Sequence, residues 1–172
     1  MNIIFYISAA VAVASTIMVI TRVNAVHALL YLIVSLLAVA LVFFTLGAPF
    51  VAALEVIIYA GAIMVLFVFV IMMLNLGSQA KGQERVWLRR STWIGPSIPG
   101  LILFLELLYV LTHQSGRMPG ANPVGPKQVG MALFGEYMLG VELASLLLLA
   151  ALVGAYHLGR RGLSAKEDGG AR

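Results

Sequence analysis

Residues 51–77 read VAALEVIIYAGAIMVLFVFVIMMLNLG, an apolar stretch that contains a single carboxylate, Glu55. A run of about 18 or more apolar residues predicts a helix that spans a membrane. A charged side chain at the centre of such a helix costs roughly 2.5–3.5 kcal/mol, so it normally faces protein or water rather than lipid. Tyr59 follows four residues later, on the same face of a helix, and three small residues come directly after it. This stretch therefore indicates a membrane helix that carries a functional polar site.

The composition of the whole chain supports an integral membrane protein. Of its 172 residues, 62% are hydrophobic and 10% are charged, and the mean hydropathy is +1.02. The apolar runs are continuous rather than alternating, which predicts helices and excludes a barrel. The chain has no cysteine, so it cannot supply the thiolates of an iron–sulfur cluster or form a disulfide. We therefore expect an all-α integral membrane protein with a single membrane domain over residues 1–172.

Five membrane spans are predicted. The first is expected to be retained rather than cleaved as a signal peptide, since no basic residue precedes it and its apolar run is long. The fourth is expected to open with Pro96 and Pro99 in its first turn, where proline is tolerated, and an irregular loop is expected between His113 and Met131. A frayed polar tail, 159–172, is expected after the last span. The predicted spans are 3–21, 26–46, 51–76, 94–112 and 135–158.

The basic residues predict the orientation of these spans. Nine of the eleven lie on the side shared by the first short link, the loop between spans three and four, and the C-terminal tail. The positive-inside rule then places the C-terminus in the cytoplasm and the N-terminus in the periplasm. Trp87 and Trp93 precede the fourth span, where an interfacial aromatic belt on the cytoplasmic side is expected. Because these charges set topology, the net charge of +4 is no sign of nucleic-acid binding.

Three acidic residues lie inside predicted spans: Glu55, Glu106 and Glu142. Intramembrane acids are candidates for proton transfer, since a carboxyl group can exchange a proton there. The competing interpretation is that each is a protonated side chain that fastens one helix to another by a hydrogen bond. That structural interpretation is weakest for Glu55, stronger for Glu142, which has Ser145 one turn along, and strongest for Glu106. Small residues on spans one and two, including Ser8, Ser35 and Ala38, predict close contact between those helices.

Other site chemistries find little support in the sequence. Tyr59 can pass or orient a hydrogen bond, although it could also serve only as a packing residue. His27, His113 and His157 each stand alone near a predicted interface, so neither a haem nor a metal site is expected. No nucleophile constellation and no nucleotide-binding glycine motif is present. The sequence therefore predicts no catalytic residue and no cofactor or metal bound by this chain.

Two stretches carry a resemblance to a known family. Residues 24–77, and above all EVIIYAGAIMVLFVFVIMMLN (55–75), resemble subunit J of bacterial respiratory NADH:quinone oxidoreductase, complex I. The mitochondrial counterpart is NADH dehydrogenase subunit 6. Residues 133–160 are similar to the last span of that family, so the resemblance covers spans two, three and five. Glu106 and Glu136 lie outside these motifs and receive no family role.

The resemblance implies a place in the membrane arm of the complex, in the bacterial inner membrane, against subunits A, H, K and N. The complex as a whole would use NADH, FMN, iron–sulfur clusters and quinone. The resemblance also implies a π-bulge in the third helix, around Tyr59, Ala60, Gly61 and Ala62, whose conversion to α-helix gates a water chain. Glu55 would lie near the chain of acids that links quinone reduction to proton pumping, and Glu142 matches an acidic position of the last helix.

The sequence thus predicts a membrane-arm subunit that helps to couple quinone reduction to proton translocation through a gate in the third helix, without a redox centre of its own. Three alternatives remain open at this stage. The chain could be a purely structural scaffold, a self-sufficient proton channel, or a subunit of a related ferredoxin- or hydrogenase-linked complex.

Overall fold

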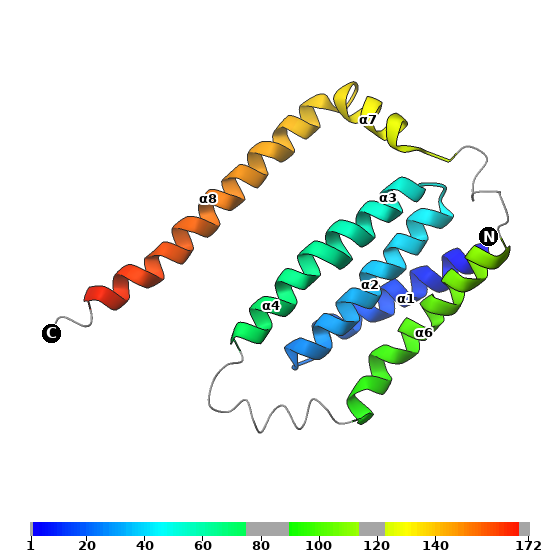
Figure 1. The fold of residues 1–172 in the computed structure, drawn as a ribbon, viewed down its shortest axis with the longest axis horizontal. Helices are drawn as coiled ribbons and strands as arrows, with labels where there is room; N and C mark the ends of the chain where they lie inside the picture. The colour runs from blue at the N-terminus through cyan, green and yellow to red at the C-terminus, as the bar shows by residue number, and fades with distance from the viewer. Residues whose placement is uncertain (1, 75–89, 114–122, 169–172) are drawn as a thin grey trace. The chain divides into compact units, whose positions relative to one another are not determined.

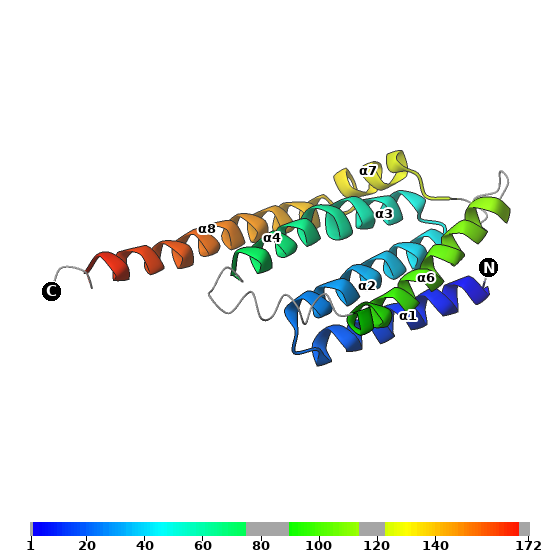
Figure 2. The same ribbon diagram turned by 60° about the horizontal axis from the view of Figure 1, so that its bottom comes forward.

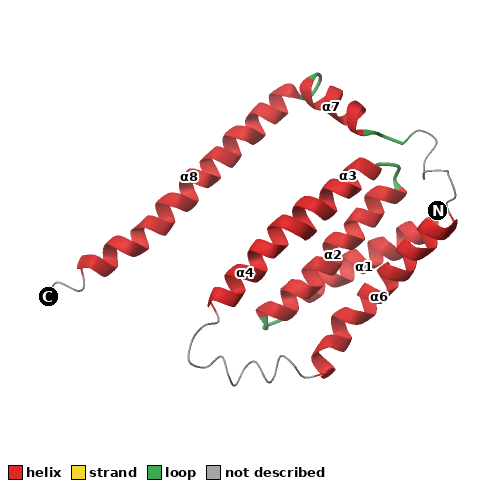
Figure 3. Cartoon of the chain, viewed as in Figure 1, coloured by secondary structure: helices red, strands yellow, loops and turns green. Residues whose placement is uncertain are grey.

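The computed structural model describes residues 2–74, 90–113 and 123–168, and all regular elements within these ranges are helical (Figure 3). Among the described residues, five helical stretches are long and apolar enough to cross a membrane, which confirms the five predicted spans: Ile3–Thr21, Ala25–Thr45, Pro49–Met73, Trp93–Thr112 and Met138–Arg160. The elements are α1 (Asn2–Thr21), α2 (Ala25–Thr45), α3 (Pro49–Leu54), the π-helix η1 (Glu55–Ile63), α4 (Met64–Leu74), α6 (Arg90–His113), α7 (Pro126–Phe134) and α8 (Met138–Asp168).

Contacts divide the chain into two compact units, Met1–Gly125 and Pro126–Arg172. In the first unit, α2 is the central helix and contacts α1, α6 and the third span. The third span is one continuous rod of α3, η1 and α4 that runs alongside α2 (Figures 1 and 2). The central position of α2 explains why it contains more buried residues than any other described span.

Small residues bring α1 and α2 close together, as the sequence predicts. Ser35 donates a hydrogen bond to the Ala12 carbonyl at 3.2 Å, and its hydroxyl lies 2.8 Å from that of Thr16. Ala38 is fully buried in the same interface. Where helix backbones approach this closely, van der Waals contact and short hydrogen bonds hold membrane helices together. The apolar core around this contact consists of Val11, Val34, Ala38, Leu41 and Leu103.

The turn between α2 and α3 is set by one glycine. Gly47 has a φ of 83°, a conformation that residues with a Cβ atom rarely adopt. Its N–H donates to Phe44 O at 3.1 Å and the next N–H, of Ala48, donates to Phe43 O at 3.0 Å, which is the Schellman pattern. Pro49 then starts α3 in a position that needs no N–H. The chain therefore reverses within a few residues, and the third span packs against α2.

The fourth span differs from its prediction at the two prolines. Helix α6 begins at Arg90, so Pro96 and Pro99 lie inside it rather than in its first turn. Proline interrupts a helix by removing an N–H donor, but membrane helices tolerate this where neighbouring groups compensate. At this point the Ser97 hydroxyl donates to Trp93 O at 2.6 Å. Gly95 lies against the Tyr31 hydroxyl of α2, where a Cβ atom would clash, so this glycine lets α6 approach α2.

The second unit contains α7 and α8. Part of the segment predicted as an irregular loop forms the short helix α7, and α8 continues to Asp168, well into the tail predicted to fray. No residue of the α8 span is buried within the described chain. The basic residues of 75–89 and 169–172, as well as Trp87 and Arg117, lie outside the described residues, so the orientation stays a prediction.

We predict that Gly47→Ala destabilises the α2–α3 turn. A Cβ atom in the left-handed conformation costs about 1–2 kcal/mol, so the thermal midpoint of the membrane-embedded chain should fall. Gly100→Ala is a matched control, since a Cβ there meets nothing within 4 Å. The midpoint is measured as the temperature at which half of the chain becomes insoluble in mild detergent. Equal midpoints for the two variants would contradict the assigned role of Gly47.

Candidate functional site

The stretch that dominates the sequence forms a nine-residue π-helix, η1, over Glu55–Ile63. The register of the backbone hydrogen bonds changes along it. At its start the N–H of Glu55 donates to Val51 O, four residues back, and after its end the N–H of Met64 donates to Tyr59 O, five residues back. A π-helix is rare and often marks a functional site. The predicted bulge around Tyr59–Ala62 is therefore present, and it extends back to Glu55.

This change of register sets the rotation of α4, the helix that follows η1, about its axis. One residue of an α-helix turns the chain by about 100°, because 3.6 residues make a full turn. A backbone hydrogen bond from one residue to the fifth residue before it encloses one more residue than the α-helical bond to the fourth. If η1 became α-helical, α4 would rotate by about this angle relative to α3. The π-helix thus links a local backbone change to the direction in which all α4 side chains face.

Gly61 lies within the π-helix, at a position with little space for a side chain. A Cβ atom at this position would come within 3.2 Å of the Val56 carbonyl oxygen, which lies five residues back. That separation is shorter than ordinary van der Waals contact between such atoms. Glycine at this position therefore avoids a close contact within the π-helix.

The two predicted proton-path residues of η1 lie close together in the chain but form no bond with each other. The Glu55 side chain is half-buried and the Tyr59 side chain is 49% exposed. Among the described residues, neither polar group forms a hydrogen bond or an ion pair. η1 packs against α2, and α4 presents mostly exposed apolar side chains. The two polar side chains thus lie on a partly exposed stretch of the third span.

Glu142 lies on α8, in the second unit, and its side chain is exposed. Ser145 lies one turn along the helix from Glu142, but its hydroxyl bonds to the backbone and not to the carboxyl group. The Ser145 hydroxyl donates to the backbone carbonyl of Glu142 at 2.7 Å, so it does not engage the carboxylate. Serine in a helix commonly forms this bond to its own preceding turn.

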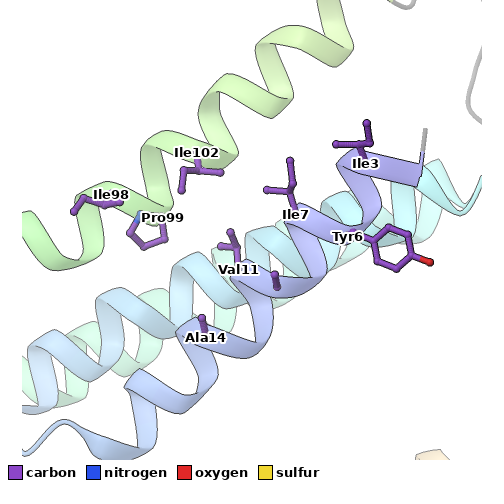
Figure 4. Close-up of a pocket in the computed structure, with 9 residues that line it drawn as sticks. Ile3, Tyr6, Ile7, Val11, Ala14, Ile98, Pro99 and Ile102 are labelled. Carbon is purple, nitrogen blue, oxygen red and sulfur yellow. The ribbon is translucent and has the colours of Figure 1, made fainter.

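Glu106 is the residue whose burial and hydrogen bonding the sequence did not predict. It is 8% exposed, and its Oε2 accepts a hydrogen bond from the Ser8 hydroxyl at 2.8 Å. Its Oε1 is buried without a partner. The two residues are 98 positions apart, so no local pattern pairs them; the only sequence signal is an acid in one span and a hydroxyl in another. Beside them, an apolar groove runs between α1 and α6 (Figure 4), lined by Ile3, Tyr6, Ile7, Ala10, Val11, Ala14, Ile98, Pro99 and Ile102.

The remaining titratable residues of the described chain form no further cluster. His27 begins α2, where the Asn24 side chain caps its backbone N–H, and its Nε2 is buried without a partner. Within the described ranges no three His, Cys, Asp or Glu side chains gather closely enough to hold a metal ion.

Comparison with known proteins places these features in a family. Residues 15–158 match the family profile described as NADH-ubiquinone/plastoquinone oxidoreductase chain 6. The chain is 60% identical over 162 residues to NADH-quinone oxidoreductase subunit J of Pseudomonas aeruginosa, covering 94% of this chain and 98% of the relative. It is 54% identical over 160 residues to the subunit of that name from Escherichia coli, covering 93% and 87%. A third relative, from Buchnera aphidicola, is 52% identical over 160 residues, covering 93% and 98%.

We predict that Gly61→Ala shifts the third span from the π register toward α-helix. The added methyl group would come within 3.2 Å of Val56 O in the π form, and alanine favours α-helix over glycine by about 1 kcal/mol, roughly a fivefold change in an equilibrium. The chain has no cysteine, so spin labels can be attached through cysteines at Ala53 and Val68, both exposed. Their distance distribution should gain a second population.

The control for that experiment is Gly154→Ala, where a Cβ meets nothing within 4 Å. It should leave the distribution unchanged. A Gly61→Ala distribution identical to that of the unsubstituted chain would show that this glycine does not select the π register.

Proposed function

The chain belongs to the NADH-ubiquinone/plastoquinone oxidoreductase chain 6 family, and on this premise we propose that it helps to couple quinone reduction to proton translocation through a gate in its third span. It is a multi-pass membrane protein and a subunit of an NADH-quinone oxidoreductase, an enzyme complex. The observation that carries the proposed mechanism is the π-helix Glu55–Ile63, which combines a carboxyl group with a backbone register that differs from the α-helical register of α3 and α4 on either side.

The gate works by rotation of α4. In the π register, α4 presents one set of apolar side chains to the space beside Glu55, and in the α register it presents another. One set admits a chain of water molecules past Glu55 and Tyr59, and the other excludes it. Events at the quinone site bias this equilibrium through contacts that differ between the two registers, because a ligand shifts only an equilibrium whose states it binds unequally.

The partners of this gate are other subunits of the membrane arm, namely A, H, K and N. The open side of η1 and the exposed apolar length of α8 support this role, since both need covering by protein or lipid. Glu142, exposed on α8, belongs to the proposed proton path as a second carboxyl contributed to a subunit contact. The inner membrane is the proposed location, with the C-terminus in the cytoplasm.

In this proposal the chain carries no redox centre and no catalytic residue of its own. It has no cysteine for an iron–sulfur cluster. NADH, FMN, the clusters and quinone are therefore assigned to other parts of the complex, and this chain supplies proton access and its timing.

A scaffold role is the main competing function. A scaffold would use Glu55 as a hydrogen-bonding fastener, but within the described residues Glu55 fastens no helix to another. The scaffold therefore needs a partner subunit to supply that bond. Glutamine can form such a bond but cannot carry a proton, so Glu55→Gln separates the two functions.

We predict that this chain migrates with the intact complex. On a mild-detergent native gel of source membranes, it should appear in a very large band that oxidises NADH. A small band without that activity would contradict the assignment and favour a self-sufficient channel. A large band that oxidises only ferredoxin or hydrogen would favour a related complex.

We predict that Glu55→Gln, Tyr59→Phe and Gly61→Val each lower NADH-driven proton translocation in complexes that still assemble. Gly61→Val should act most strongly on the gate, since it adds a branched side chain against Val56 O. Proton uptake per electron is measured in sealed vesicles, alongside the NADH oxidation rate and the native-gel band. Gly154→Ala is the control.

Unchanged pumping in assembled Glu55→Gln and Tyr59→Phe complexes would support the scaffold. Unchanged pumping in an assembled Gly61→Val complex would overturn the gate while leaving Glu55 as a proton carrier.

A further inference from the structure

The Ser8–Glu106 pair is a polar site that the proposed gate does not use. Glu106 lies on α6 and Ser8 on α1, whereas η1 packs against α2. Ser8 is completely buried, and Glu106 is 8% exposed. Both residues are covered by this chain itself, so their surroundings do not depend on a partner subunit.

The hydrogen bonding of Glu106 is incomplete. Oε2 accepts from the Ser8 hydroxyl at 2.8 Å, but the buried Oε1 has no partner. An ionised carboxylate would leave Oε1 with a share of negative charge and no donor or cation near it. Burying a charge in this way costs far more free energy than burying a neutral polar group.

The helices packed against α6 supply no cation for Glu106. On α1 the titratable side chain nearest to Ser8 is Tyr6, which is 69% exposed. The first charged side chain along the sequence is that of Arg22, which follows the end of α1. Arg22 is fourteen residues from Ser8, about 21 Å along the helix, and it lies over the Tyr31 ring.

Helix α2 supplies none either. Its titratable residues are His27 and Tyr31, both in its first third. Tyr31 faces Gly95 of α6, which is eleven residues before Glu106, or about 17 Å. His27 is a further turn away. On α6 itself no other charged residue occurs between Trp93 and Thr112, and Tyr109, one turn from Glu106, is 53% exposed. His113 ends the helix seven residues after Glu106, about 11 Å along it. The groove beside the pair is apolar (Figure 4), so the neutral acid is the form that these surroundings favour.

We propose that Glu106 is a proton-binding site of this chain: its carboxyl group stays neutral while α6 packs on α1, and it releases its proton only when the two helices separate. With Ser8 donating to Oε2, the proton resides on Oε1. On separation, water reaches Oε1, the O–H bond breaks, and the water molecule accepts the proton. The electron pair stays on the carboxylate, which the same water then solvates.

The site has a physical reason to respond to movement of α6. Contact between α1 and α6 is limited, and the groove lies directly beside the pair. Helix α6 packs more extensively on α2 than on α1, so a displacement that keeps the α2 contact separates α6 from α1 and admits water to Oε1. A carboxyl group that only joined the two helices by a hydrogen bond would keep its proton both in the resting complex and during turnover.

The first test is infrared spectroscopy of the purified complex at neutral pH. The carbonyl band of a neutral carboxylic acid should be present in the unsubstituted complex and lost in Glu106→Gln. In Ser8→Ala the band should remain but move to higher frequency, because the hydrogen bond to Oε2 is lost. Glu136→Gln changes an exposed carboxyl and is the control that should leave the band unchanged.

The second test follows exchange of that proton in heavy water. The Glu106 band should shift slowly in the resting complex and faster during NADH turnover. Identical acid-carbonyl spectra for the unsubstituted and Glu106→Gln complexes would mean that Glu106 is ionised, which overturns the proposal. A shift that is immediate at rest, or that turnover does not accelerate, would overturn release on helix separation. If Glu106→Gln fails to assemble, the frequency change in Ser8→Ala identifies the band instead.

Discussion

Every backbone N–H and C=O inside a membrane must find a hydrogen-bond partner within the protein, because the hydrocarbon offers none. This constraint explains the irregular points of the fold. At the α2–α3 turn, the N–H groups of Gly47 and Ala48 donate hydrogen bonds to carbonyls at the end of α2. At the prolines of α6, the Ser97 hydroxyl adds a bond to a nearby carbonyl. Between α3 and α4, the backbone keeps its bonds by shifting register rather than by breaking them.

The register shift at η1 is compatible with a switch for the same reason. Both the π and the α register satisfy the backbone, so exchange between them costs no net hydrogen bond, and side-chain contacts decide which one is populated. The contact between a Cβ at position 61 and Val56 O is one such contact, and glycine removes it. To move an equilibrium from about 1:99 to 99:1 takes roughly 5.5 kcal/mol. A gate of this kind therefore needs several contacts that differ between the two registers. The groups that cover the exposed face of η1 must supply most of these contacts.

The sequence predicts the spans because they depend on local features, apolar length and the Gly47 turn. It predicts the π-helix only through the family resemblance of residues 55–75, and the π-helix begins four residues earlier than the predicted bulge at Tyr59. It does not predict what depends on distant residues. Pro96 reads as a helix start, yet α6 begins at Arg90 and continues through it, next to the point where Gly95 lies close to Tyr31 of α2. Glu106 reads as the least informative acid, because its partner Ser8 is 98 positions away. Residues that act within one helix can be read from the chain, whereas those that act between helices need the fold.

The two first-unit carboxyls differ in what controls them. Glu106 is enclosed by its own chain, so its protonation depends on how α6 lies on α1. Glu55 is half-buried and without a partner in the described residues, so its protonation depends on the groups that cover η1 in a membrane complex. Helix α2, which carries no acidic residue itself, packs against both α6 and η1, the elements that carry these two carboxyls. The two carboxyls therefore share a packing neighbour, although the enclosed one is bonded to α1 and the other to no described residue.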